Sequence, residues 1–375
     1  MADSLDTDVA IIGGGIVGFA VAHFLGAHRH VTVLEMEDQP GYHSTGRSAA
    51  VLVQAYEGGP TQALTGLSRA YLVAEQAGLA PHPLLSPRGQ LVIADAAHVA
   101  ELDAQAASFG DVAHAFEMID GVAARALCPM LRPDAVARAL WEPGSFDIDV
   151  DGLLQAYVRS ARRSGKFVCG SRVEALDWDG EAWTVSTQQG SLRAGTIVNA
   201  AGGWAGAIGN LAGATAVPLQ PALRTAVTVD PPVGVDASNW PFVITVREDC
   251  YFKPEGGRLM VSLGDERPCD AHDAWPEDLD VALAIDRLQG IAEIDVTRIV
   301  RSWAGLRTFA PDRAPVIGWD SAAPNFCWAA GLGGFGVQTS PAIGAIVASI
   351  VAGETDSRFP VTAALRAALS PARFA

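Results

Sequence analysis

One stretch decides the fold of this chain: Asp8-Val9-Ala10-Ile11-Ile12-Gly13-Gly14-Gly15-Ile16-Val17-Gly18, followed by Val31-Thr32-Val33-Leu34-Glu35. The pattern predicts a strand, a glycine turn, a helix over residues 16–28, and a second strand that ends at an acid. In this GxGxxG spacing, Gly13 permits the tight turn, Gly15 lets backbone approach a pyrophosphate, and Gly18 lets the helix pack closely on the strand. Glu35 lies about 20 residues on, where a carboxylate accepts hydrogen bonds from ribose hydroxyls. We therefore expect a dinucleotide whose phosphates face the unpaired N–H groups at the helix N-terminus.

The composition is that of a folded enzyme with a small-molecule ligand. The chain has 375 residues, which suits two domains or one elaborated domain. Hydrophobic residues make up 49% and charged residues 18%, and the formal net charge of -16 argues against nucleic acid and anionic membranes as partners. The apolar stretch 343–351 is too short for a transmembrane segment and predicts a buried helix.

The cysteines and the N-terminus favour a cytoplasmic protein without a metal. The five cysteines are scattered, and no CxxC occurs, so we interpret them as thiols of a reducing compartment. The N-terminal MADSLDTD lacks the basic and apolar regions of a signal peptide. The carboxylates show no metal-ligand spacing, so we expect no metal.

Further along the chain, nucleotide-fold pieces alternate with antiparallel pieces. Helices are predicted over 61–78, 97–109, 120–127, 151–164 and 277–292, and strands over 89–94, 165–168 and 298–307. A hairpin is predicted across Asp179-Gly180. Asp149 or Asp151 is placed to cap the helix predicted over 151–164. Residues 195–204 form a buried strand that enters a glycine turn, and residues 220–265 alternate like antiparallel strands. This order implies two discontinuous domains, with residues 36–60 irregular.

Several motifs occur in an order that resembles one known family. They are the N-terminal GGGIVG, Gly41–Ala50, His82–Arg88, Val198–Gly202, Trp303–Arg307, Asp312 with Pro315–Gly318, and Gly333–Ser340. Together they resemble the FAD-dependent D-amino acid oxidase superfamily, which includes glycine oxidase and sarcosine oxidase, and most of all its D-arginine dehydrogenase branch. The resemblance implies an α/β fold, with a discontinuous Rossmann-like FAD-binding domain of the GR2 type and an α+β substrate domain built on an antiparallel sheet. We expect residues 1–86, 150–219 and 305–375 to form the first domain, and residues 87–149 and 220–304 the second.

The resemblance implies FAD rather than NAD. In relatives the helix that opens after residues 333–336 lies by the flavin, where its N–H groups would stabilise the negative charge of a reduced flavin. Relatives that attach flavin covalently use a cysteine just after the position of Arg307, and Thr308–Asp312 contains none, so we expect noncovalent FAD. The expected cofactor-binding residues are Gly13, Gly15, Val17, Gly18, Glu35, Met36, Ser44, Thr45, Gly46, Arg47, Ser48, Ala49, Ala50, Val51, Val173, Ala201, Gly202, Trp204, Arg307, Gly333, Gly334, Phe335, Gly336, Val337 and Gln338.

By the same resemblance, Arg224, Tyr251 and Arg307 hold the substrate carboxylate over the flavin. A guanidinium forms a planar bidentate clamp for a carboxylate, and a phenol adds a further donor. Tyr56 belongs to a mobile lid in the D-arginine branch, and glycines follow it at Gly58 and Gly59. The expected substrate pocket is lined by Val51, Gln90, Gly334 and Gln338. His43 and His82 are interpreted as structural residues and not as catalytic bases.

Two departures from the branch affect the substrate. The D-arginine branch has a histidine where this chain has Val51, and an acid where it has Gln90. A buried cationic side chain without a carboxylate partner is costly, so we expect a neutral or apolar substrate side chain.

These features together predict oxidative deamination of a D-amino acid, with a keto acid and ammonia as final products and oxygen, a quinone or another acceptor taking the electrons. Oxidation of an N-methyl or cyclic amino acid, or of a 2-hydroxy acid, remains an alternative, because the same clamp would serve each of them. A nicotinamide-dependent dehydrogenase and a noncatalytic flavin-binding subunit are more distant alternatives.

Overall fold

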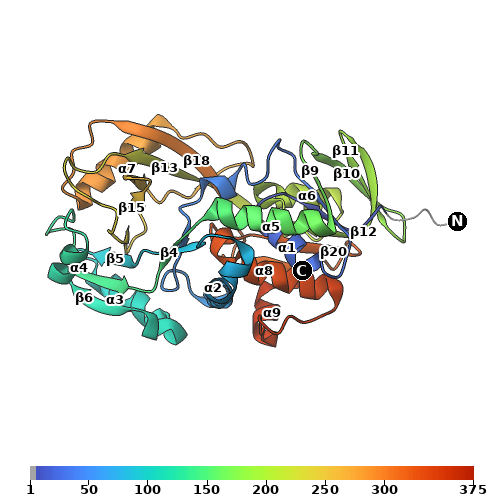
Figure 1. Ribbon diagram of the computed structural model, residues 1–375, viewed down its shortest axis with the longest axis horizontal. Coiled ribbons are helices and arrows are strands. Elements are labelled where there is room, and N and C mark those ends of the chain that lie inside the picture. The colour runs from blue at the N-terminus through green and yellow to red at the C-terminus, as the bar shows by residue number, and fades with distance from the viewer. Residues whose placement is uncertain (1–5) are drawn as a thin grey trace.

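The structure, a computed structural model, describes residues 6–375 and divides into two lobes (Figure 1). The first lobe contains a sheet with strand order β10-β11-β12-β1-β2-β9, in which β20 also pairs with β12 and β19 pairs with β20. Its strands are β1 (Thr7–Ile12), β2 (Val31–Leu34), β9 (Gly165–Val168), β10 (Val173–Trp178), β11 (Trp183–Thr187), β12 (Gly190–Asn199), β19 (Val316–Trp319) and β20 (Phe326–Ala330). The pairs β1–β12, β1–β2, β2–β9 and β12–β20 are parallel, and the pair β1–β2 belongs to the βαβ unit that the opening motif predicts.

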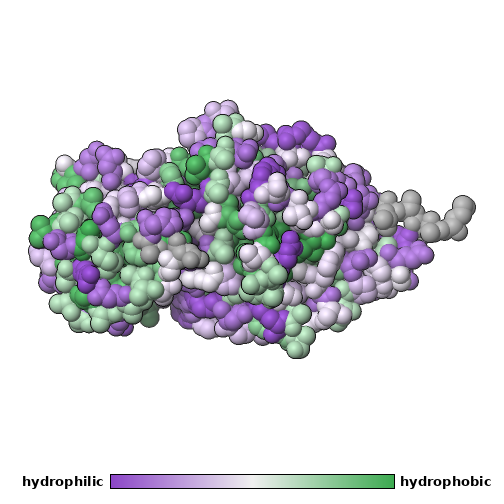
Figure 2. All heavy atoms as spheres, turned by 90° about the horizontal axis from the view of Figure 1, so that it is seen from below, coloured by the Kyte–Doolittle hydropathy of each residue, from purple (hydrophilic) through white to green (hydrophobic). Residues whose placement is uncertain are grey.

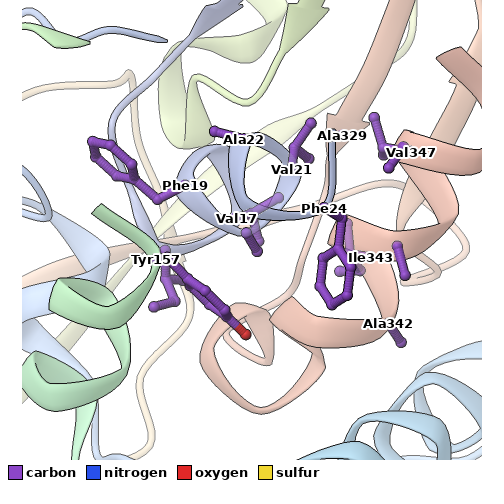
Figure 3. Packing of buried hydrophobic residues seen from close by; sticks show 14 of the residues in the cluster. Val17, Phe19, Val21, Ala22, Phe24, Tyr157, Ala329, Ala342, Ile343 and Val347 are labelled. Carbon is purple, nitrogen blue, oxygen red and sulfur yellow. The ribbon is translucent and has the colours of Figure 1, made fainter. Parts of the chain in front are cut away.

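The helices of the first lobe pack on this sheet and on each other. They are α1 (Ile16–Leu25), α2 (Gly59–Leu79), α5 (Val150–Ser164), α6 (Ala205–Leu211), α8 (Gly336–Ala352) and α9 (Ala363–Leu369). Figure 3 shows α1 against α8, with Val17 and Phe24 near Ile343 and with Tyr157 of α5 on a neighbouring side. A Cβ on Gly344 would lie 2.7 Å from the backbone of Ala20, so the absence of a side chain permits this close approach.

The second lobe is built on a sheet with strand order β17-β13-β16-β15-β14-β5-β7-β6, in which β18 also pairs with β13. Its strands are β5 (Gln90–Ala94), β6 (Glu117–Asp120), β7 (Arg138–Glu142), β13 (Gln220–Val229), β14 (Phe242–Thr245), β15 (Tyr251–Glu255), β16 (Arg258–Ser262), β17 (Arg267–Pro268) and β18 (Ile299–Phe309). Its helices are α3 (Val99–Ser108), α4 (Gly121–Leu127) and α7 (Asp278–Ile291). All of the pairs are antiparallel except β14–β5, so the expected antiparallel substrate-domain sheet is confirmed with one parallel junction.

A small third sheet lies between the lobes. It joins β3 (Val51–Leu52), β8 (Phe146–Ile148) and β4 (Leu85–Pro87) in the order β3-β8-β4. Strand β3 lies within residues 36–60, which were expected to be irregular, because a two-residue strand has no periodicity of its own. The domain limits remain a prediction, and β18 runs as one strand through the expected limit between residues 304 and 305.

Most predicted elements are present, with shifted ends. The first helix ends at Leu25 and not at residue 28, because Gly26 follows it and glycine is a poor helix former. Asp149 caps α5 by accepting a hydrogen bond from the Gly152 N–H at 2.8 Å. The buried helix α8 includes Pro341, and the Ser340 hydroxyl donates to the Val337 carbonyl that the proline cannot bond.

The surface shows no single dominant patch on the face drawn in Figure 2, where hydrophilic and hydrophobic residues are intermixed. Within residues 6–375, no helix is long and apolar enough to cross a membrane.

Candidate active site

A cavity of about 320 Å³ lies where the two large sheets meet, and its lining comes from both lobes. The first lobe contributes the glycine turn after β1, the end of β2, residues 41–53 and the start of α8. The second lobe contributes side chains of β13, β14, β15 and β18. Segments from residue 12 to residue 338 therefore converge on one space.

One end of the cavity has the geometry expected for a dinucleotide. Gly13 has φ +109°, and a Cβ there would lie 2.3 Å from the Ala200 carbonyl oxygen, so only glycine fits the turn. Helix α1 begins at Gly15 with no side-chain cap from that residue and no acid in its first turn. Thr45 Oγ1 accepts a hydrogen bond from the Ile16 N–H at 3.0 Å and closes the turn from the opposite side.

Glu35 lines the same end, but its oxygens already have protein partners. Oε2 accepts from the Gly14 N–H at 2.7 Å and Oε1 accepts from the Glu37 N–H at 3.0 Å. Burial raises the pKa of the Glu35 carboxyl, although these two hydrogen bonds act in the opposite direction. Its contact with a ribose stays a prediction.

The segment that follows, Ser44–Val51, connects the two lobes beneath the cavity. The Ser44 hydroxyl donates to the Leu306 carbonyl at 2.6 Å, and the Arg47 guanidinium donates to the Ala304 carbonyl at 3.0 Å and to Asp273 at 2.5 Å. Ala50 adopts a left-handed backbone with φ +59°. Arg47 lines the cavity, and its guanidinium anchors the segment on β18 and on Asp273.

The start of α8 closes another side of the cavity. Gly334 has φ +90°, and a Cβ there would lie 2.5 Å from Nε of Arg307. Gln338 is buried, and its side chain accepts from the Val53 N–H at 3.2 Å and donates to Thr65 Oγ1 at 2.9 Å. Gln338 thus fixes the strand that bears Val51, which is the expected substrate wall.

The sheet register places Arg224, Tyr251 and Arg307 on one face. Arg307 pairs across β13–β18 with Ala222, two residues from Arg224, and side chains two residues apart share a face. Tyr251 reaches the same face through its neighbour Ser262, which pairs with Ala226. All three residues line the cavity, and their hold on a substrate carboxylate stays a prediction.

The guanidinium of Arg224 is buried and incompletely bonded. Its Nε donates to the Asp265 carbonyl at 2.7 Å and its Nη2 donates to Glu266 Oε1 at 3.0 Å. Its Nη1 is buried and has no hydrogen-bond partner within residues 6–375. Buried donors are almost always satisfied, so this nitrogen indicates that a ligand acceptor belongs beside it.

The electrostatics of the three groups favour an anion. Burial would raise the pKa of the Tyr251 phenol, but the nearby Arg224 and Arg307 guanidiniums lower it below its ordinary value. The centre of the Arg224 guanidinium lies 5.8 Å from the centroid of the Tyr251 ring. A positive potential that favours a phenolate would equally favour a carboxylate.

Tyr56 also lines this cavity. Its hydroxyl donates to Glu248 Oε2 at 2.7 Å, and its ring lies 5.4 Å from the ring of Phe335. Burial and the neighbouring Glu248 carboxylate raise the pKa of the Tyr56 phenol, which therefore remains a neutral donor. Its movement as a lid stays a prediction.

Four expected residues lie outside the cavity lining, and the other expected residues line it; the four are Gly18, Gly46, Gly333 and Gln90. Gly18, Gly46 and Gly333 pack behind it, where a Cβ on Gly18 would lie 1.9 Å from the Gly13 carbonyl oxygen. Gln90 is fully buried beneath the site and donates to the Ala55 carbonyl at 2.8 Å, opposite Glu142 on β7. Burial raises the pKa of Glu142, whose carboxylate accepts from the backbone of residues 54 and 55.

Both histidines have structural partners. His43 lines the cavity, bonds Glu37 Oε1 through Nε2 at 2.8 Å and packs on Trp204. His82 is exposed and bonds Asp149 at 3.0 Å. Sequence reasoning missed Phe242 and Val53 in the lining and the acids behind Arg224, because none of them belongs to a motif.

A dinucleotide-type turn, a helix N-terminus and a pair of arginines share one cavity, an arrangement typical of an oxidoreductase that uses a nucleotide cofactor. Residues 8–350 match the family described as FAD dependent oxidoreductase, so the chain belongs to that family. The resemblance to this superfamily, its FAD dependence and its mixed α/β fold are thereby confirmed.

The chain is similar to several named proteins. It is 24% identical over 356 residues to a glycine oxidase of Geobacillus kaustophilus, and this match covers 92% of each chain. It is 26% identical over 211 residues to the hydrogen cyanide synthase subunit HcnC of Pseudomonas aeruginosa, but that match covers 54% of this chain and only 48% of the subunit.

Among solved structures, the fold resembles glycine oxidase from Geobacillus kaustophilus with a TM-score of 0.86 and 23% identity, over 98% of each chain. It also resembles L-proline dehydrogenase from P. horikoshii with a TM-score of 0.83 and 23% identity, over 99% of this chain and 98% of the other. At this identity the two structures show the fold alone.

Proposed function

We propose that this chain oxidises the α-amino group of a D-amino acid with a neutral or apolar side chain. The observation that carries the proposal is the unpaired Nη1 of Arg224 in the cavity that Arg307 and Tyr251 also line. The glycine oxidase relative acts on glycine, which combines an amine with a carboxylate, and this supports the same substrate class. The preference for the D configuration and the placement beside the D-arginine dehydrogenase branch depend on the sequence motifs.

The cavity residues fit FAD in its noncovalent form. The glycine turn at Gly13 and Gly15 would hold the pyrophosphate, and the 44–51 segment with Gly334 and Phe335 would enclose the ring. When bound, FAD supplies a two-electron acceptor for the hydrogen on the substrate α-carbon. Thiols within the described lining are absent, so attachment through a cysteine has no candidate there.

The chain's own residues would bind and orient the substrate. Arg224 and Arg307 would grip the carboxylate, and the Tyr251 hydroxyl would contribute a further donor. This grip fixes the direction of the α-carbon hydrogen, and such positioning supplies much of the rate in reactions of this kind. Val51, Val53 and Phe242 form apolar walls, which favour an uncharged side chain.

Anaerobic reduction of the bound flavin tests the function. The purified yellow protein is mixed with D- and L-amino acids that include branched and aromatic members, with N-methyl and cyclic amino acids, and with 2-hydroxy acids. Bleaching near 450 nm by neutral D-amino acids, with release of ammonia and a keto acid, is the expected result. Release of formaldehyde would instead identify oxidation of an N-methyl amino acid, and a keto acid without ammonia would identify oxidation of a 2-hydroxy acid. If none of the compounds bleaches the flavin, the proposed enzymatic function is excluded. Acid precipitation should release all of the flavin into the supernatant.

A further inference from the structure

The residues that hold Arg224 lie behind the cavity, on the turn between β16 and β17. The Asp265 carbonyl and the Glu266 carboxylate take Nε and Nη2 of this guanidinium, at 2.7 Å and 3.0 Å. Because a guanidinium is planar, two fixed nitrogens define the direction of the third. Glu266 therefore helps to decide where Nη1 points.

Glu266 is itself held from the outer side by a second arginine. Arg313 donates to Oε2 of Glu266 through Nη1 at 2.9 Å and to Oε1 through Nη2 at 3.2 Å. The Arg313 guanidinium stacks on the ring of Phe309 at 4.3 Å, and its Nε lies 3.3 Å from Oε1 of Glu57. Glu57 directly follows Tyr56 in the chain.

This arrangement balances charge as well as direction. Burial alone would raise the pKa of Glu266, but the hydrogen bond and charge of Arg313, with Arg224 and Arg307, lower it below its usual value. A carboxylate shared by two arginines stays ionised and leaves Arg224 free to accept a second anion. Without Arg313, the full negative charge of Glu266 would oppose a ligand carboxylate at Arg224.

We propose that Glu266 is a positioning residue that aims Nη1 of Arg224 at the substrate carboxylate, and that Arg313 holds Glu266 in place. This inference rests on the proposed function, because it requires that the ligand of Arg224 is a carboxylate. Glu266 acts through Arg224 and does not line the cavity within the described chain. Its side chain is 29% exposed and that of Arg224 is 8% exposed, so the acid lies between solvent and the clamp.

Ligand titrations of the oxidised holoenzyme test the inference. The change in the flavin absorption spectrum measures binding of acetate, benzoate and pyrrole-2-carboxylate, each paired with its uncharged amide. Glu266→Ala is expected to weaken the tightest of these carboxylates about tenfold and to leave its amide within about twofold. Glu266→Gln keeps an acceptor oxygen for Arg224 and is expected to restore affinity to within about threefold of wild type.

The outer contact is tested with a matched pair of surface arginines. Arg313→Gln is expected to weaken the carboxylate about threefold, and this loss should disappear in the Glu266→Ala background because the two residues act in series. Arg132→Gln is the control, since Arg132 is 43% exposed and pairs with Asp134, as Arg313 is 44% exposed and pairs with acids.

The possible outcomes distinguish failure of the Glu266 proposal from failure of the proposed carboxylate-binding function. If wild type binds none of the carboxylates more tightly than their amides, the proposed carboxylate site fails and this inference fails with it. If wild type binds them and Glu266→Ala is unaffected, or loses the amide equally, Glu266 does not position Arg224 and only this inference is overturned. A Gln variant as weak as the Ala variant would also contradict positioning, because the acceptor oxygen that it restores to Arg224 would then have no effect on binding.

Discussion

Gly334 and Gly353 flank helix α8 and offer a matched test of the role of Arg307. Both have positive φ, +90° and +75°, so alanine at either position carries about 1–2 kcal/mol of backbone strain. They differ in what a Cβ would meet. At Gly353 no other atom lies within 4 Å, whereas at Gly334 the Cβ would lie 2.5, 2.7 and 2.8 Å from Nε, Cδ and Cζ of Arg307.

Gly334→Ala should therefore displace the Arg307 guanidinium, while Gly353→Ala should not. The strain reduces the free energy of unfolding in both variants by about 1 kcal/mol, once the lower entropy of the unfolded alanine chain is taken into account. The contact with Arg307 adds to this loss in Gly334→Ala alone. The displaced guanidinium loses a charge-assisted hydrogen bond to the ligand, worth about 1.5–3 kcal/mol. That loss corresponds to a dissociation constant roughly 10-fold to 150-fold higher for a carboxylate ligand.

Urea denaturation and spectral titration with benzoate measure the two quantities separately. The expected pattern is a loss of stability in both variants, no smaller in Gly334→Ala, combined with weaker benzoate binding in Gly334→Ala alone. If both variants bind benzoate like wild type although Gly334→Ala is folded and retains flavin, Arg307 does not hold a carboxylate. Equal loss of affinity in both variants would instead assign the effect to strain in α8.

Three further results are expected. Arg307→Ala should raise KM for carboxylate substrates at least about tenfold, and an unchanged KM in steady-state assays would reject the clamp. Gln90→Glu should lower the free energy of unfolding by about 1–3 kcal/mol, because it removes the donor to Ala55 and buries a second acid opposite Glu142. The selectivity of this variant for arginine over leucine should stay the same as in wild type. A shift toward arginine would show that residue 90 does face the substrate. The raised pKa of Glu142 means that the folded state binds more protons than the unfolded state above about pH 4.5, so this group's contribution to stability falls as pH rises. Urea titrations at pH 5 and pH 7 should therefore show that Glu142→Gln gains stability relative to wild type at the higher pH. A difference in stability that stays constant between the two pH values would contradict the shift.

The sequence predicted those parts of the fold that local patterns encode. The opening βαβ unit, the hairpin across Asp179-Gly180 and the cap at Asp149 each depend on residues close together in the chain. The same holds for Gly334, whose motif places it at the start of α8. Resemblance, not periodicity, brought Arg224, Tyr251 and Arg307 together before the strand register was known.

What the sequence could not predict comes from contacts between distant segments. Glu266 bonds Arg224 across 42 positions and Arg313 across 47, and no spacing rule connects them. Gln90 is a further example, since its hydrogen bond to the Ala55 carbonyl joins residues 35 positions apart and is not apparent from either segment. One strand of the small third sheet, β3, pairs with β8 almost a hundred residues away, so its residues carry no local signal.

Because residues from 12 to 338 line one cavity, binding of a ligand in that cavity should also change the thermal stability of the whole protein. A molecule that enters this space bridges both lobes and binds the folded state alone, so it raises the melting temperature by mass action. Heating the flavin-loaded protein with candidate acids one at a time would therefore rank them by affinity without any turnover, and without knowing which acceptor reoxidises the enzyme.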